Sequence, residues 1–349
     1  MLSVKNPIMT GFFPDPSICR VGNKFYTVHS TFAYFPGVPV FESEDLVHWN
    51  LISNVLDRDS QVPLSGCQHS EGIFAPTIRY HKGTWYMITT NVSDQGNFIV
   101  TAKDPRGPWS EPYYLGESTG GIDPSLFFDD DGTCYYIGQR PRSAGYRYNG
   151  DCEIWVQTLD LDTMQLKPDA TIVLTGFQRK AIWPEGPHLY KKDGYYYILH
   201  AESGTSIHHS VMVARSKNVF GPYEYCPCNP ILTHRHLGAQ YPVTCVGHAD
   251  LVDDGNGNWY MVVLACRPNQ GYTLLGRETF LAKVTWEDGW PVVNAGVGHL
   301  EEVVTLPYEG QISDDAPQCK TYTFDTPSLP PELLTLRNHR DHELELHAE

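Results

Sequence analysis

The sequence predicts an all-β protein and, within that class, a five-bladed β-propeller. A phrase in which a short apolar run leads to a polar turn and then a Tyr-rich run occurs five times, and helical periodicity is almost absent. The copies begin 60, 48, 63 and 63 residues apart, at Asp15, Ala75, Asp123, Gly186 and Ala249. One supersecondary unit reused at such intervals is typical of a closed radial array.

Each repeat holds enough strand-like segments for one four-stranded blade. Runs rich in Val, Ile, Tyr and Phe, such as KFYTVHS and YYYILHA, are bounded by turn sequences such as VGNK and KKDG. A second hairpin follows in each unit, as in FIVTAKDPRGPWSEP. We therefore expect a propeller over residues 1–305. Residues 306–349 are rich in Pro and charge, and they are interpreted as a linker or a strap on the propeller, or as the start of a C-terminal β-sandwich module.

Charge and composition restrict the partners of this chain. Its 349 residues carry a formal net charge of −16, which repels polyanions, so nucleic acid and anionic membranes are not expected partners. No stretch of 18 apolar residues suggests a membrane span. The 21 Tyr, 14 Phe and 8 Trp exceed what a core requires, and a sugar-binding cleft is a common use of such residues, so we expect an oligosaccharide partner. The oligomeric state stays open.

The N-terminus and the cysteines suggest a compartment. The segment MLSVKNPIMTGFFPDPS has no cationic stretch followed by a long apolar run, so no signal peptide is expected. The nine cysteines are odd in number and form no CxxC pair, which is typical of reduced thiols. We expect a cytoplasmic location, and an extracellular one stays open if a leader has been removed.

Acidic residues stand at or beside the start of three repeats, namely Asp15, Asp123 and Glu185. The repeat starts converge near the axis of a radial array, so these three carboxyl groups are expected to share one pocket. Prolines on both sides of Asp15 fix its backbone. Prolines and bulky apolar neighbours should raise the pKa of Glu185, as a general acid requires. The alternatives are a turn-capping role for Asp15 and a surface loop for Glu185.

The motifs around these residues resemble those of glycoside hydrolase family 43. In the family's order, they are NPIMTGFFPDPSICRVGNKFYTV, STFAYFPGVPVFESEDLVHW, GIFAPTIRY, GIDPSLFFDDDG, EGPHLY, GHADLV and LGRET. The resemblance covers roughly residues 5–310. It implies a five-bladed propeller that hydrolyses terminal pentoses with inversion, α-L-arabinofuranose or β-D-xylose, from xylan-derived oligosaccharides, with no required cofactor. It further implies that Asp15 is the general base, that Glu185 is the general acid, and that Asp123 tunes and orients Glu185.

The same resemblance gives roles to other residues. Arg277 of LGRET would donate hydrogen bonds to sugar hydroxyls and to Asp123, with a structural ion pair as the alternative. His248 of GHADLV precedes the fifth repeat start by one residue, as Glu185 precedes the fourth. It would face the axis, contact the sugar, or hold a structural Ca²⁺ near the axis through water. A buried core histidine is the alternative.

Thr205, Phe32, Phe74 and Ala75 are predicted to line the sugar site. Relatives dominated by xylosidase activity often carry Trp at the position of Phe74, so this stretch looks closer to the α-L-arabinofuranosidase branch. Such relatives also often have a C-terminal β-sandwich that closes the pocket, and here this module is missing or only begun.

Two other functions were weighed against this one. A non-catalytic carbohydrate-binding propeller would keep the aromatic residues but would not need the three acids, and all three are present. The residues Gly116, Ser118 and Gly120 fit the G-x-S-x-G pattern of serine esterases. That pattern needs a helix after it, whereas the strand-like GIDPSLFF follows here.

Overall fold

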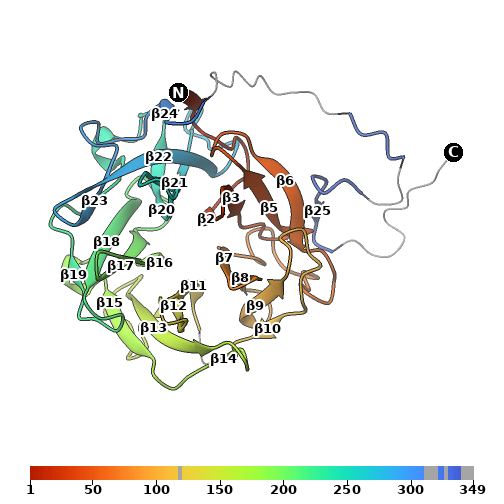
Figure 1. Ribbon diagram of the computed structural model, residues 1–349, viewed down its shortest axis with the longest axis horizontal. Coiled ribbons are helices and arrows are strands. Elements are labelled where there is room, and N and C mark those ends of the chain that lie inside the picture. Colours follow the sequence, from red (N-terminus) through yellow and green to blue (C-terminus); the bar gives the residue numbers. More distant parts are fainter. Residues whose placement is uncertain (117–119, 310–320, 326–328, 339–349) are drawn as a thin grey trace.

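The computed structural model describes residues 1–116, 120–309, 321–325 and 329–338. Viewed along the axis, five blades are arranged in a ring around it, which confirms the predicted all-β propeller (Figure 1). The helices in the described part are two 3-10 turns, Phe177–Arg179 and Arg235–Leu237. No helix among these residues has the length and apolar character that a membrane span requires.

Each blade is an antiparallel sheet made from one continuous stretch of chain, and its first strand is the one nearest the axis (Figure 1). From the axis outward, the first blade consists of β2 (Ser17–Val21), β3 (Lys24–Val28), β5 (Gly37–Ser43) and β6 (Asn50–Leu56), and the second of β7 (Thr77–His81), β8 (Thr84–Asn91), β9 (Gly96–Ala102) and β10 (Tyr113–Tyr114). The third blade consists of β11 (Ile122–Phe128), β12 (Cys134–Pro141), β13 (Cys152–Asp160) and β14 (Gln165–Leu166), and β15 (Thr171–Thr175) also pairs with β13. The fourth consists of β16 (Glu185–Lys192), β17 (Tyr195–Glu202), β18 (Ser210–Ser216) and β19 (Glu224–Tyr225), and the fifth of β20 (Thr244–Asp253), β21 (Trp259–Cys266), β22 (Glu278–Glu287) and β23 (Trp290–Val293).

The hydrophobic core is divided into five clusters, one in each gap between neighbouring blades. Trp85 is buried between the first and second blades, and Trp155 between the second and third. Both faces of a blade are therefore covered, which is why the central strands are apolar nearly throughout instead of alternating. The aromatic richness of the sequence is used largely in these gaps.

The ring closes without a shared strand, because no strand of the first blade pairs with a strand of the last among the described residues. Other contacts join these blades. The terminal segments form a two-stranded ribbon of β1 (Leu2–Lys5) and β24 (Val303–Leu306). At the axis, the Asp250 carboxylate in β20 accepts hydrogen bonds from the Ser17 hydroxyl at 2.8 Å and the Ile18 amide at 3.0 Å in β2.

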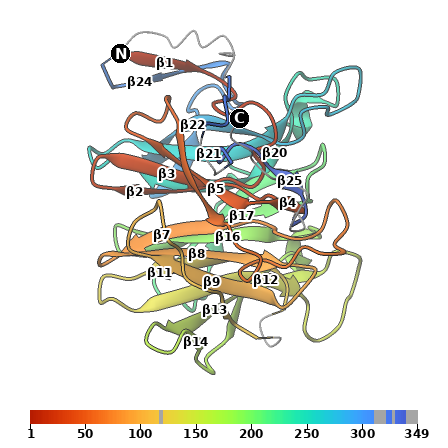
Figure 2. The same ribbon diagram turned by 90° about the vertical axis from the view of Figure 1, so that its right-hand side faces the viewer.

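Residues 329–338 lie against the first blade (Figures 1 and 2). Strand β25 (Thr335–Leu336) pairs with β4 (Tyr34–Phe35), and the Asn54 side chain donates to the carbonyl of Pro331 at 2.9 Å. The division of the chain near residue 305 stays a prediction.

Eight cysteines among the described residues, from Cys19 to Cys266, are free thiols. The cytoplasmic location stays a prediction.

We predict that Asp250→Ala lowers the free energy of unfolding by about 3–5 kcal/mol, because it leaves the largely buried Arg79 without its counter-ion. Arg79 lies 3.0 Å from Asp250, which is fully buried. Urea denaturation measures the change. Asp253→Ala is the matched control, since Asp253 pairs with Arg20 across the same two strands but is much more exposed, and it should cost less than about 1 kcal/mol. Equal losses in the two variants would contradict this account of ring closure.

Candidate active site

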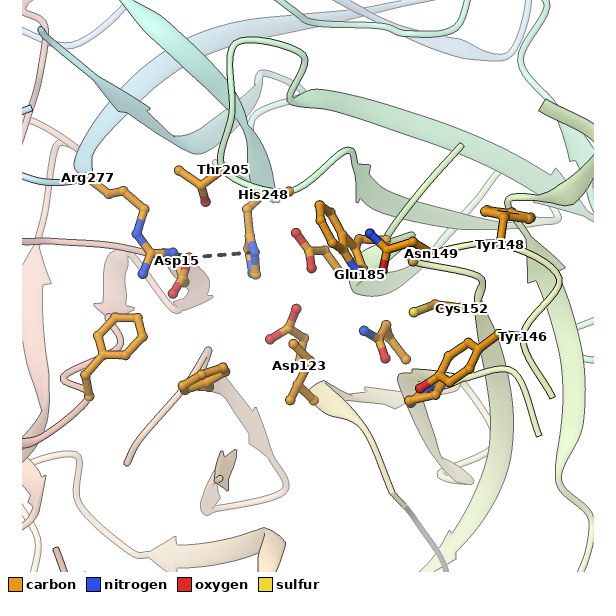
Figure 3. Close-up of a pocket in the computed structure, with 18 of the residues that line it drawn as sticks. Asp15, Asp123, Tyr146, Tyr148, Asn149, Cys152, Glu185, Thr205, His248 and Arg277 are labelled. Atoms are coloured by element: carbon orange, nitrogen blue, oxygen red, sulfur yellow. Dashed lines mark hydrogen bonds and ion pairs between the residues drawn. The ribbon is translucent and has the colours of Figure 1, made fainter. Parts of the chain in front are cut away.

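A pocket of about 850 Å³ lies at the end of the axis where the inner strands begin, and all five blades contribute to it (Figure 3). The three predicted acids line it together: Asp15 precedes β2, Asp123 is the second residue of β11, and Glu185 is the first residue of β16. In Figure 3 the carboxyl groups of Asp123 and Glu185 point into the same space, with Asp15 beside Arg277 and His248. The structure therefore brings the three acids together, as expected.

A left-handed backbone conformation, shared by four blades, orients the polar side chains of the pocket. Four blades place a left-handed residue at the same position, two residues before a buried polar residue of the inner strand. These residues are Asp15 (φ 52°), Asp123 (φ 55°), Gly186 (φ 57°) and His248 (φ 50°). Left-handed backbone is costly for residues other than glycine, and such strain is often found at functional sites.

This register corrects one expectation from the sequence. His248 was expected to be equivalent to Glu185, but it occupies the position of Gly186, one residue later. The reason is that Asp250, rather than Leu251, is the counterpart of His188: both are buried, both stand two residues after a left-handed residue, and their side chains lie 3.9 Å apart. Irregular pairing just before each residue hides this alignment in the sequence.

Asp15 is held in its ionised form. Its Oδ1 accepts from Arg277 Nη1 at 2.7 Å and lies 3.7 Å from His248 Nδ1, and its Oδ2 accepts from the Ser30 hydroxyl at 2.5 Å. Burial works to raise the pKa of Asp15, but Arg277, His248 and Ser30 outweigh it, so the pKa lies below its ordinary value. This carboxylate can therefore accept a proton from water.

Asp123 and Glu185 are shifted in the opposite direction. Burial raises the pKa of Asp123 to about 6, and the negative charge of Asp15 adds to the rise, although His248 and the Gly186 amide oppose it. That amide donates to Asp123 Oδ2 at 3.0 Å. Burial, followed by the charges of Asp123 and Asp15, raises the pKa of Glu185 well above its ordinary value. This environment therefore favours the protonated form of Glu185, the form that a general acid needs.

His248 faces the pocket, as predicted, and its ring packs closely on Gly186. A Cβ atom at residue 186 would lie 3.0 Å from the imidazole, so only glycine fits there without displacing the ring. No group of three or more His, Cys, Asp or Glu side chains suited to a metal ion occurs in the described residues. The calcium expected at His248 stays a prediction.

Arg277 and two phenylalanines form one wall of the pocket. The guanidinium lies 4.9 Å from the centre of the Phe32 ring, which is 5.3 Å from the Phe74 ring. The structure places the hydrogen bond of Arg277 on Asp15 rather than on Asp123, where it had been expected. The ion pair that was the alternative for Arg277 is therefore present, and its donation to sugar hydroxyls stays a prediction.

The remaining predicted residues differ in their placement. Thr205 lines the pocket, whereas Ala75 is buried and is not among the lining residues. Ser118 of the esterase pattern lies outside the described residues, and the segment after Gly120 enters strand β11.

The far side of the pocket was missed by the sequence reasoning. It is formed by the turn between β12 and β13 and by the segment before β16, and its members are Tyr146, Arg147, Tyr148, Asn149, Gly150 and Trp183. Asp151 is fully buried and pairs with Arg147 at 2.7 Å, which anchors this turn. The turn belongs to one blade and is not repeated, so the fivefold pattern gave no signal for it. The aromatic and basic cluster YRYN was the available signal.

An ionised carboxylate and two carboxyl groups with raised pKa values in one pocket are typical of glycoside hydrolases. The family comparison agrees, because the model of glycosyl hydrolases family 43 matches residues 4–291. The chain belongs to this family, as its motifs indicated.

Among the relatives, a xylosidase/arabinosidase of Butyrivibrio fibrisolvens is 66% identical over 307 residues, which are 88% of this chain and 59% of the relative. A non-reducing end alpha-L-arabinofuranosidase of Bacteroides ovatus is 46% identical over 309 residues, 87% of this chain and 55% of the relative. The solved xylan beta-1,4-xylosidase of Bacillus halodurans C-125 has a TM-score of 0.86 and 40% identity, over 97% of this chain and 65% of that one. The chain thus spans about three fifths of the length of these relatives.

We predict that Arg277→Met raises the pKa of Asp15, because the variant removes the positive charge that most lowers it. A carbon-13 NMR titration of the aspartate carboxyl groups, assigned with Asp15→Asn, measures the shift. Arg267→Met is the control, since Arg267 lies near the same loop but pairs with Glu278 at 2.6 Å. An unchanged Asp15 titration in Arg277→Met would refute this electrostatic assignment.

Proposed function

We propose that this protein is an exo-acting glycoside hydrolase that removes a single terminal pentose with inversion of configuration. The observation that carries the proposal is the opposite pKa displacement of Asp15 and Glu185 in one pocket. One group is ready to accept a proton and the other to donate one, which is the pair that glycosidic hydrolysis requires.

Asp15 acts as the general base in this proposal. Its low pKa keeps it ionised, and its contacts with Arg277 and Ser30 hold both oxygens in place. A water molecule on the Asp15 side of the sugar would lose its proton to this carboxylate as its oxygen attacks the anomeric carbon. Inversion follows, because the attack and the departure of the leaving group take place on opposite faces.

Glu185 acts as the general acid on the other face. It gives its proton to the glycosidic oxygen as the bond to the anomeric carbon breaks, so the leaving group departs as an alcohol. Asp123 keeps Glu185 protonated through its charge, and its bond to the Gly186 amide fixes the backbone next to Glu185. The step begins with Asp15 ionised and Glu185 protonated, and ends with these states exchanged.

The sugar is proposed to be α-L-arabinofuranose, β-D-xylose or both, from arabinoxylan-derived or xylan-derived oligosaccharides. The support comes from the names of the relatives, which are xylosidases and arabinofuranosidases. Phe32, Phe74 and Thr205 offer apolar and hydroxyl surface for one small ring. A non-catalytic sugar-binding propeller would have no use for displaced carboxyl pKa values, and the assay below separates the two functions.

We predict that Asp15→Asn and Glu185→Gln each lower kcat by about 10²–10⁴-fold, since each removes one proton-transfer group. Initial rates with 4-nitrophenyl α-L-arabinofuranoside and 4-nitrophenyl β-D-xyloside measure the effect. Glu202→Gln is the control, because Glu202 is also buried with a raised pKa in the same blade but does not line the pocket. Near-normal turnover in Asp15→Asn would refute the base assignment, and an inactive wild type would favour the binding protein.

We predict that Asp123→Asn moves the alkaline limb of the kcat profile to lower pH. Glu185 must be protonated to act, and the charge of Asp123 raises its pKa. Without that charge Glu185 loses its proton at lower pH, so activity declines earlier as the pH rises. Asp129→Asn is the control, because Asp129 lies in the turn at the other end of β11. A limb that stays in place, or moves to higher pH, would contradict the role of Asp123.

A further inference from the structure

A second layer of polar side chains lies beneath the pocket, outside the proton-transfer scheme. Its members stand two residues after Asp15, Ala75, Asp123, Gly186 and His248, and they are Ser17, Thr77, Ser125, His188 and Asp250. All five are buried. Buried polar groups are costly unless they are hydrogen-bonded, so the way these groups are joined determines how the inner strands are held.

Asp250 joins the two strands on the base side of the pocket. Strand β20 carries His248 and Asp250, and strand β2 directly follows Asp15. Asp250 Oδ2 accepts from the Ser17 hydroxyl and from the Ile18 amide, both in β2. The backbone that carries Asp15 is therefore tied to the backbone that carries His248.

His188 joins the two strands on the acid side. It lies in β16, three residues after Glu185, and its Nδ1 is 3.0 Å from the hydroxyl of Ser125 in β11, two residues after Asp123. This bond crosses between the strands that carry the general acid and the group that tunes it. The bulges in both strands end at these two residues.

Arg79 in β7 connects the two sides. Its Nη1 donates to Asp250 Oδ2 at 3.0 Å and to the Ser17 hydroxyl at 3.2 Å, and its Nη2 lies 3.1 Å from His188 Nδ1. Arginine has no acceptor and stays charged, so His188 Nδ1 must accept from it and the ring is neutral. Burial holds the pKa of His188 at about 3, in agreement with that state.

We propose that Arg79 is a positioning residue that sets the separation of the base strand from the acid strand. The inference rests on the proposed function. Arg79 is not among the residues that line the pocket, and it comes from the one blade without a pocket-facing acid or histidine. The two terminal nitrogens of its planar guanidinium reach Asp250 on the base side of the pocket and His188 on the acid side. A lysine amine is a single point charge on a flexible stem and cannot reproduce that fork.

The test is steady-state kinetics of Arg79→Lys with a 4-nitrophenyl pentoside. We expect kcat to fall by about 10–100-fold with KM nearly unchanged, because a small misplacement of acid and base impairs proton transfer more than sugar binding. Arg20→Lys is the matched control, since Arg20 also joins β2 to β20, through Asp253 at 3.0 Å, but near the opposite end of these strands. Its kcat should stay within about twofold of the wild type if distance from the site protects turnover.

Arg79→Ala with added guanidinium separates positioning from a general loss of structure. A cavity of about 290 Å³ beside Arg79 gives the ion room to enter. We expect millimolar guanidinium to restore part of the kcat of Arg79→Ala but none of that of Asp15→Asn. Wild-type kcat in Arg79→Lys would overturn the inference, as would parallel losses in kcat, KM and Tm without rescue. A wild type that hydrolyses no pentoside would instead overturn the proposed function, and this inference with it.

Discussion

The buried Asp250 carboxylate is the interaction on which the rest of the structure depends. No strand is shared between the first and last blades in the described chain, so their union at the axis relies on side chains. Asp250 meets the second blade through Arg79 and the fourth through the Tyr190 hydroxyl, in addition to Ser17 in the first. Burial alone would raise its pKa, but Arg79, His188 and Tyr190 outweigh it and keep the group ionised. A fully paired charge of this kind favours one arrangement of the strands, because most displacements leave a buried group unsatisfied.

The pocket above this layer shows how one environment can give carboxyl groups opposite roles. Burial works in the same direction on Asp15, Asp123 and Glu185. The difference arises because the Arg277 guanidinium bonds Asp15. Asp15 is consequently ionised, and its negative charge then adds to the rise in the pKa values of Asp123 and Glu185. The position of Arg277 thus divides the acids into a base and an acid pair, and a hydrogen bond from Arg277 to Asp123 would have assigned them differently.

The blades and the meeting of the three acids could be predicted from the sequence, because both depend on a pattern repeated around the axis. The alignment of His248 failed by one residue, since strand bulges shift the register without a change in composition. The wall made by Tyr146 and Trp183 could not be predicted, because it belongs to single loops that only the closed ring brings to the pocket. The hydrogen-bond partner of Arg277 could not be predicted either. Two carboxylates, Asp15 and Asp123, lay near its expected position, and distances of a few ångströms decide between them.

Inversion requires space for one water between Asp15 and the sugar while Glu185 acts on the opposite face, and the configuration of the first product reports on this arrangement most directly. Proton NMR of the released pentose, recorded before mutarotation, identifies its anomer. Inversion predicts β-L-arabinofuranose from an α-L-arabinofuranoside, or α-D-xylose from a β-D-xyloside. A first product that keeps the configuration of the substrate would show that a carboxylate, and not water, attacks the anomeric carbon. That result would contradict the arrangement of base and acid described above.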